Sequence, residues 1–176
     1  IDIEMLHKIR ELWPQKKLQI HLMSKNPNFW ISQLPKSRNT EVFFHYDENV
    51  NIEKISSLIL SKNFIPGVVL HNQMSESQIS KLMNLFSNFM VLCVGKAGFS
   101  GQVFQNKYSD LINKLIKISE QVNDVKITLD GGITPKIASK FNVQEVVSAS
   151  SILNDEDSKK QIINFQTSQK YQDSEQ

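Results

Sequence analysis

Six short apolar segments, separated by segments of helical periodicity, constrain the fold of this 176-residue chain more than any other feature. The segments 51–63, 75–88 and 108–122 place apolar side chains on one helical face, and Thr134 followed by Pro135 is typical of a helix start. The pattern predicts buried strands that alternate with amphipathic helices. The six apolar segments are LQIHLM at 18–23, EVFFHY at 41–46, PGVVLH at 66–71, FMVLCV at 89–94, VKITLD at 125–130 and EVVSAS at 145–150.

This order of elements indicates an α/β fold. Strands buried on both faces and joined by helices form a parallel sheet, because each helix returns the chain to the same end of the sheet. An open doubly wound sheet and a (β/α)8 TIM barrel both satisfy the order. The glycine- and serine-rich turns follow the late strands, and many barrels bind phosphate in the turns after strands seven and eight. The sequence therefore favours a barrel in which the six visible segments are strands 3 to 8.

Composition and charge exclude several classes of protein. The net charge is only +2 and the charges are scattered without a basic run, so nucleic acid is not expected as a partner. The longest apolar run, 89–94, is far shorter than the ~20 residues that a membrane-spanning helix needs. The single cysteine, Cys93, lies inside that run and is expected to be a core residue. These features predict a cytoplasmic protein. We expect one barrel domain over residues 1–165 and a polar tail over residues 166–176.

Four polar residues stand at the carboxyl ends of the predicted strands: His21, His45, His71 and Asp130. These ends share one face of a parallel α/β protein, so the four side chains can converge. Each histidine alone is more often a hydrogen-bonded structural residue. Together, imidazole and carboxylate groups are the ligands that a divalent transition metal prefers.

Three turns rich in glycine and serine follow the last three strands, at 96–102, 130–135 and 148–151. Glycine lets backbone N–H groups approach an anion closely, and a helix start adds unpaired donors. One such turn would be weak evidence, but three after consecutive strands predict a phosphate site.

Five motifs in this order resemble the ribulose-phosphate 3-epimerase family over Leu18 to Leu153. They are IHLMSKNP, VFFHYDEN, AGFSGQVF, LDGGITPKIASKF and VVSASSIL. The resemblance implies a (β/α)8 barrel that interconverts ribulose 5-phosphate and xylulose 5-phosphate, a phosphorylated ketopentose pair of the pentose phosphate pathway. Such an isomerase inverts carbon 3 through an enediolate, which requires two acid/base groups and a metal that stabilises the oxyanion.

The resemblance assigns roles to residues of this chain. His21 would bind the metal and lie at the substrate, Asp130 would bind the metal and deliver a proton, and Met23 would lie near the substrate. The metal would be zinc, iron, manganese or cobalt, which these ligands do not distinguish. Backbone donors for the phosphate would come from Gly98, Phe99, Ser100, Gly101, Gly131, Gly132, Ala149 and Ser150.

The chain also departs from the family pattern. The family's first two strands carry a substrate-contacting serine and a His-x-Asp pair that supplies the other histidine ligand and aspartate. We expect these on roughly 40–50 residues upstream of Ile1, at the usual length of a βα unit. Without them, the 176-residue chain is expected to bind metal poorly and to be inactive.

Seven positions differ from the family residues: His71, Asn72, Gln73, Lys96, Ala97, Ser100 and Ala149. An alanine or serine preserves a glycine's backbone donor only where φ is negative. A diverged homologue that binds a phosphorylated sugar or no ligand therefore stays an alternative, as does an enzyme with another substrate. The oligomeric state, a homo-oligomer included, is left open by the sequence.

Overall fold

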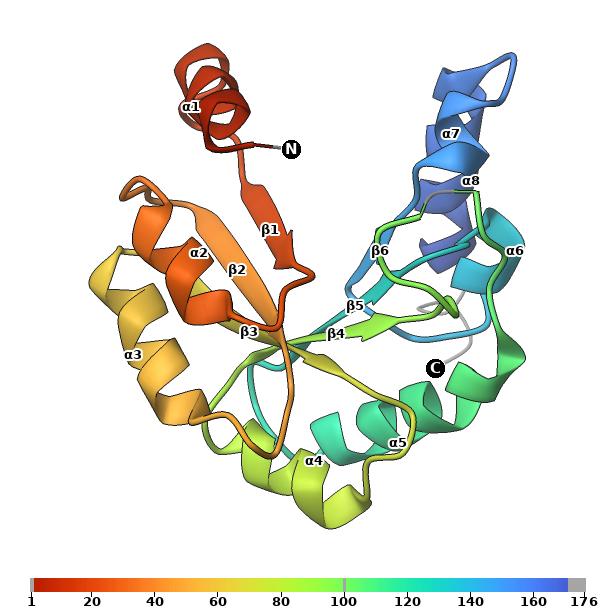
Figure 1. Ribbon diagram of the computed structural model, residues 1–176. Coiled ribbons are helices and arrows are strands. Elements are labelled where there is room, and N and C mark those ends of the chain that lie inside the picture. Colours follow the sequence, from red (N-terminus) through yellow and green to blue (C-terminus); the bar gives the residue numbers. More distant parts are fainter. Residues whose placement is uncertain (1, 100, 171–176) are drawn as a thin grey trace. The chain divides into compact units, whose positions relative to one another are not determined.

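The computed structural model describes residues 2–99 and 101–170 (Figure 1). The chain divides into two compact units, Ile1–Val69 and Leu70–Gln176. The division of the sequence into one domain and a tail stays a prediction, although the last helix continues past residue 165 to Lys170. None of the helices in the described part is long and apolar enough to cross a membrane.

The first unit contains three parallel strands in the order β1, β2, β3. Its elements are α1 (Ile3–Leu12), β1 (Leu18–Leu22), α2 (Pro27–Gln33), β2 (Thr40–His45), α3 (Ile52–Ser61) and β3 (Ile65–Leu70). Helices α2 and α3 contact each other and lie on the same side of these strands (Figure 1). All three strands were expected from the sequence, and α2 was not. Asn26 starts α2, because its side chain accepts a hydrogen bond from the Phe29 N–H and Pro27 takes the first helical position.

The core of the first unit lies around β2. Phe43 and Phe44 are fully buried, and so are Ile55 and Ile59 on the inner face of α3. The expectation of strands buried on both faces is wrong for β1, whose five residues are all half-buried. The reason is that β1 lies at the edge of the sheet and has β2 as its neighbour on one side.

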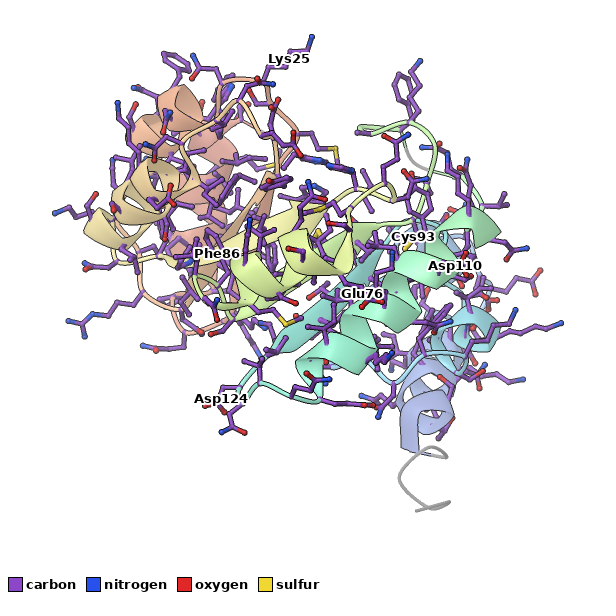
Figure 2. All side chains as sticks on the ribbon, turned by 90° about the horizontal axis from the view of Figure 1, so that it is seen from below. Lys25, Glu76, Phe86, Cys93, Asp110 and Asp124 are labelled. Atoms are coloured by element: carbon purple, nitrogen blue, oxygen red, sulfur yellow. The ribbon has the colours of Figure 1, made fainter. Side chains whose placement is uncertain are left out.

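The second unit contains three further parallel strands in the order β4, β5, β6. Helices α4 and α5 contact each other, and α8 contacts α6 and α7. The helical face expected over 75–88 is buried through Ile79, Leu82 and Met83. Phe86, which continues this face, is also buried (Figure 2). Thr134 caps α6 through its hydroxyl, as the sequence predicted. The elements are α4 (Glu76–Met83), β4 (Asn88–Leu92), the 3-10 helix η1 (Asn106–Tyr108), α5 (Ser109–Ser119), β5 (Lys126–Asp130), α6 (Pro135–Ala138), β6 (Glu145–Val147), α7 (Ser150–Leu153) and α8 (Ser158–Lys170).

Candidate functional site

In the first unit, two histidines meet at the carboxyl ends of neighbouring strands. His21 lies next to Phe43 in the β1–β2 register, and His45 ends β2 two residues later. The Nε2 atoms of the two histidines are 2.9 Å apart, and their rings are inclined by only 23°. One ring therefore donates an N–H to the other, with the roles set by the tautomers.

The environment of His45 keeps its imidazole neutral. Burial and, to a smaller extent, the charge of His21 lower the pKa of His45 to about 4. A neutral imidazole is the form that donates a lone pair to a metal ion. His45 is therefore ready to accept a hydrogen bond or to bind a cation at neutral pH.

The low pKa of His45 predicts an acid-sensitive fold. The unfolded chain binds a proton to this residue below pH 6.5 and the folded chain only near pH 4, so the free energy of unfolding falls as pH drops through this window. We expect a loss of about 1 to 2 kcal/mol, after allowing for the solvent that screens the half-buried ring. Urea unfolding of chelator-treated protein between pH 4 and 7 measures it. A His45→Gln variant should show a flatter profile, and an identical slope would contradict the prediction.

In the second unit, the three turns predicted to bind phosphate lie against one another. The turn after β5 contains Gly132, where a Cβ atom would come within 2.2 Å of the Phe104 nitrogen, so this turn lies directly against the segment after β4. The Ser148 hydroxyl, after β6, donates a hydrogen bond of 2.8 Å to the Ile133 carbonyl. The three turns therefore form one continuous surface at the carboxyl ends of β4, β5 and β6.

The turn after β4 is closed by the side chain of Gln102. Its Nε2 donates to the carbonyls of Lys96 (2.6 Å) and Phe99 (2.7 Å), and its Oε1 accepts from the Lys96 N–H. Gly98 and Gly101 have φ of 82° and 76°, which favour glycine. The Lys96 ammonium lies 4.0 Å from the centre of the Phe99 ring. A positive charge is thus fixed beside the expected donors of this turn.

One of the departures from the expected pattern, Ala149, is explained by the structure. Ala149 has a φ of −107°, so alanine keeps the backbone conformation without strain and its N–H remains a possible donor. Ser100 lies outside the described residues. His71 is exposed in the turn after β3.

Asp130 ends β5 and is tied to β4 through the backbone. It is paired with Leu92 in the strand register, and its carbonyl accepts a hydrogen bond of 2.6 Å from the Cys93 N–H. Cys93 is fully buried, and burial raises the pKa of its thiol to about 12. The expectation that Cys93 is a core residue is confirmed, since a thiol with this pKa forms almost no thiolate at neutral pH.

A family model described as "Ribulose-phosphate 3 epimerase family" matches residues 1–153. The match covers most of the chain, from its first residue to the end of α7. The chain belongs to the ribulose-phosphate 3-epimerase family. This is an isomerase family, and the resemblance recognised in the sequence from Leu18 onward is confirmed and extends to the region of α1.

Two curated proteins named ribulose-phosphate 3-epimerase are similar to the chain. Those of Helicobacter pylori strains J99 and 26695 are 27% and 26% identical over 155 residues, which is 82% of this chain and 68% of each relative. The chain is therefore only distantly related to these two proteins, but the similarity covers most of its length.

Solved structures give the same fold. The 3-hexulose-6-phosphate synthase from Salmonella typhimurium aligns with a TM-score of 0.62 at 13% identity, over 95% of this chain and 79% of the synthase. A protein from Aquifex aeolicus VF5 aligns with a TM-score of 0.55 at 11% identity, over 95% and 65%. At sequence identities this low, the similarity shows the fold alone. They confirm a partial (β/α)8 barrel.

Of the four polar residues at strand ends, the structure brings His21 and His45 together. Sequence reasoning placed both histidines among the four strand-end residues that can converge on a metal, and the family resemblance gave a ligand role to His21 alone. In the parts of the chain that are described, no group of three or more histidine, cysteine, aspartate or glutamate side chains is placed to hold a metal ion.

The chain does contain one His-x-Asp sequence, at 45–47, which sequence reasoning passed over. In this structure, the aspartate of this sequence, Asp47, accepts hydrogen bonds within the turn that follows. The Oδ1 atom of Asp47 accepts hydrogen bonds from the backbone N–H (2.8 Å) and the side-chain amide (3.0 Å) of Asn49. One oxygen of the Asp47 carboxylate is therefore used within its own turn.

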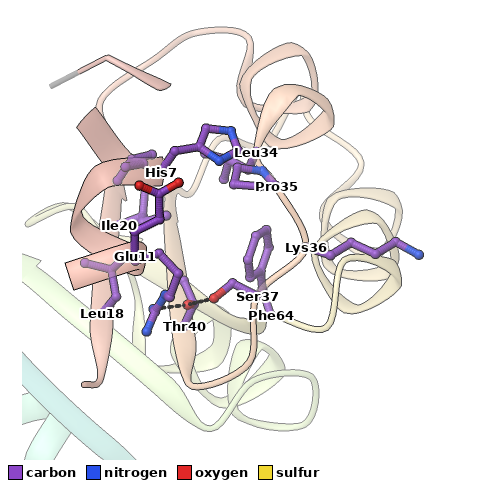
Figure 3. A pocket seen from close by; sticks show the side chains of 12 residues that line it. His7, Glu11, Leu18, Ile20, Leu34, Pro35, Lys36, Ser37, Thr40 and Phe64 are labelled. Atoms are coloured by element: carbon purple, nitrogen blue, oxygen red, sulfur yellow. Dashed lines mark hydrogen bonds between the residues drawn. The ribbon is translucent and has the colours of Figure 1, made fainter. Parts of the chain in front are cut away.

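A cavity of about 210 Å³ in the first unit lies away from the histidine pair (Figure 3). Leu18 and Ile20 line it, and successive residues of a strand point to opposite faces, so His21 points to the other side of β1. At its edge Arg10 donates to the Thr40 hydroxyl at 2.8 Å. The cavity separates α1 from the strands and does not belong to the candidate site.

Proposed function

We propose that this protein is a phosphosugar 3-epimerase that interconverts D-ribulose 5-phosphate and D-xylulose 5-phosphate. The family match over residues 1–153 carries the proposal, because it includes the histidine of β1, the aspartate of β5 and all three turns of the second unit. Since the matching relatives are named as epimerases, the alternative of a non-catalytic homologue is not favoured. The proposed substrate is a phosphorylated ketopentose of the pentose phosphate pathway, and the cytoplasm is the proposed location of the reaction.

The turns of the second unit would hold the phosphate group. Gly131 and Gly132 have positive φ, and Val94 and Phe104 leave no room for a Cβ atom at either position, so the backbone itself forms the surface there. Backbone N–H groups of this turn, of Gly98 to Gly101 and of Ala149 and Ser150 are the proposed donors. Lys96, held beside Phe99, would add a positive charge. Binding the phosphate would fix the position of the reacting carbon 3 relative to the protein group that exchanges its proton.

Asp130 would exchange the proton at carbon 3. Asp130 is the last residue of β5, so its carboxyl group stands directly before the glycine turn. The residue that would move the proton and the turn that would hold the phosphate are therefore adjacent in the chain. A second acid/base group on the opposite face of the substrate completes the inversion. The family pattern assigns this role to the aspartate of its His-x-Asp pair.

A divalent metal fits the donor groups of the chain. The neutral imidazole of the histidine pair and a carboxylate at a strand end are donors for zinc, iron, manganese or cobalt. When bound, the metal supplies a positive charge that stabilises the enediolate oxygen. His21 and Asp130 are the proposed ligands.

A coupled assay of ribulose 5-phosphate epimerisation tests the proposal. The full-length gene product should be active, and treatment with a chelator should reduce activity by at least about 100-fold, since the metal lowers the barrier by several kcal/mol. Adding back zinc, iron, manganese or cobalt one at a time identifies the ion. Full-length protein that is folded and metal-loaded but inactive would refute the function.

A further inference from the structure

We propose that the cavity between α1 and β1 binds a small free amino acid with a branched apolar side chain, such as leucine. Arg10 would hold the carboxylate of the ligand, Glu11 would hold its ammonium group, and the apolar floor of the cavity would bury its side chain. The inference goes beyond the proposed function, because none of the described residues that line the cavity belongs to the candidate site.

The cavity exists because α1 packs loosely on the rest of the first unit. None of the ten described residues of α1 is buried. Leu18 and Ile20 point to the same face of β1, line the cavity and stay half-buried. Leu34 and Phe64 line it as well and are almost fully buried (Figure 3). These side chains form an apolar floor against which the side chain of a ligand would be removed from water.

The size of the cavity limits the ligand to a small molecule. A cavity of roughly 150 Å³ holds benzene, so one of about 210 Å³ suits roughly eight or nine non-hydrogen atoms. Valine, leucine and isoleucine are of this size. A nucleotide or a peptide is larger than the cavity.

Arg10 supplies a fixed positive charge at the cavity. Its Nη1 donates to the carbonyls of Pro14 (3.2 Å) and Lys16 (2.7 Å), and its Nη2 donates to the Thr40 hydroxyl (2.8 Å). All three acceptors are neutral, and within the described part of the chain no carboxylate pairs with Arg10. Its Nε atom is buried and has no hydrogen-bond partner there. The charge is therefore partly desolvated without compensation, and a carboxylate in the cavity would neutralise it.

Glu11, the next residue of α1, supplies the opposite charge. It is exposed, lines the cavity and forms no ion pair with another described residue. The Lys36 side chain points away from the cavity (Figure 3). Glu11 would repel a ligand that carries only a carboxylate, and Arg10 would repel a ligand that carries only an amine. An amino acid satisfies both residues, since its carboxylate and its ammonium group are attached to one carbon.

Calorimetric titration of the protein with L-leucine tests the inference without an activity measurement. We expect one saturable site with a Kd of about 10 μM to 1 mM, which is well within the limit for a ligand of this size. Leucinamide lacks the carboxylate, and 4-methylpentanoate lacks the ammonium group. Each should bind at least about 10-fold more weakly than leucine, the usual loss when a charged hydrogen-bond partner is removed.

Two variants locate the binding in this cavity. Leu6→Trp fills the space with a larger side chain of α1 and should abolish leucine binding. Glu11→Gln should weaken binding at least about 10-fold. Glu4→Gln is the matched control, because Glu4 is an exposed glutamate of the same helix, and it should leave the affinity within about twofold. Arg10 is kept in all variants, since it ties α1 to the segment before β1.

The outcomes decide the inference independently of the proposed function. Leucine binding that is lost in Leu6→Trp and weakened in Glu11→Gln supports it, whether or not the full-length protein is an epimerase. Equal affinities for leucine, leucinamide and 4-methylpentanoate would reduce the site to an apolar cavity and overturn it. The absence of leucine binding at about 10 mM, ten times the weakest expected Kd, would also overturn it. So would unchanged affinity in a Leu6→Trp variant that circular dichroism shows to be folded.

Discussion

Replacing Asp130 by asparagine is expected to lower kcat for ribulose 5-phosphate epimerisation by about 10²- to 10⁴-fold, the usual contribution of a positioned acid/base group. Asparagine preserves the size of the side chain but cannot exchange a proton. Because the backbone carbonyl of Asp130 accepts the bond from Cys93, the change leaves the link between β4 and β5 intact. The coupled assay on full-length protein measures the effect, and circular dichroism checks the fold.

Asp124→Asn is the matched control for this experiment. Asp124 is exposed in the turn between α5 and β5 (Figure 2) and has a φ of 62°, a conformation that asparagine adopts readily. The same chemical change there should leave kcat within about twofold, since exposed substitutions away from a site rarely matter. Activity retained by Asp130→Asn at the level of this control would remove Asp130 from the mechanism.

Replacing Gly132 by alanine is expected to lower the free energy of unfolding by about 2 to 5 kcal/mol, as strain at positive φ and overpacking add. The new Cβ would stand 2.2 Å from the Phe104 nitrogen and 2.5 Å from the Val103 carbonyl carbon. Both atoms belong to the backbone, so neither can turn away as a side chain would. Separation of the two turns should also weaken binding of inorganic phosphate. Urea unfolding and phosphate titration measure the two effects.

Gly98→Ala separates steric collision from backbone strain. Gly98 also has a positive φ, of 82°, but a Cβ atom there would meet nothing within 4 Å. Only the conformational strain applies, and we expect a loss of about 1 kcal/mol. If the two variants are equally stable, the close contact of the turns after β4 and β5 does not exist in solution.

The elements that the sequence predicted well are those with a strong local signal. The six apolar segments became six strands, and the helical faces of α3, α4 and α5 became buried. Helix α2 was missed because its seven residues, PNFWISQ, include exposed aromatic side chains that hide the periodicity, while its start depends on the Asn26 cap. The half-exposure of β1 was missed because a strand's position in the sheet is not encoded in its own residues.

The sequence by itself determined the parallel α/β architecture, the family and the identity of the turns after β4, β5 and β6, because apolar periodicity and glycine placement are local properties of the chain. The tertiary structure decided which groups meet. It placed Nε2 of His45 against that of His21, set Gly132 against the backbone at Phe104, and gave Ala149 a φ that tolerates a side chain. Such contacts depend on strand register and on the path of turns between distant segments, which packing of the whole unit sets.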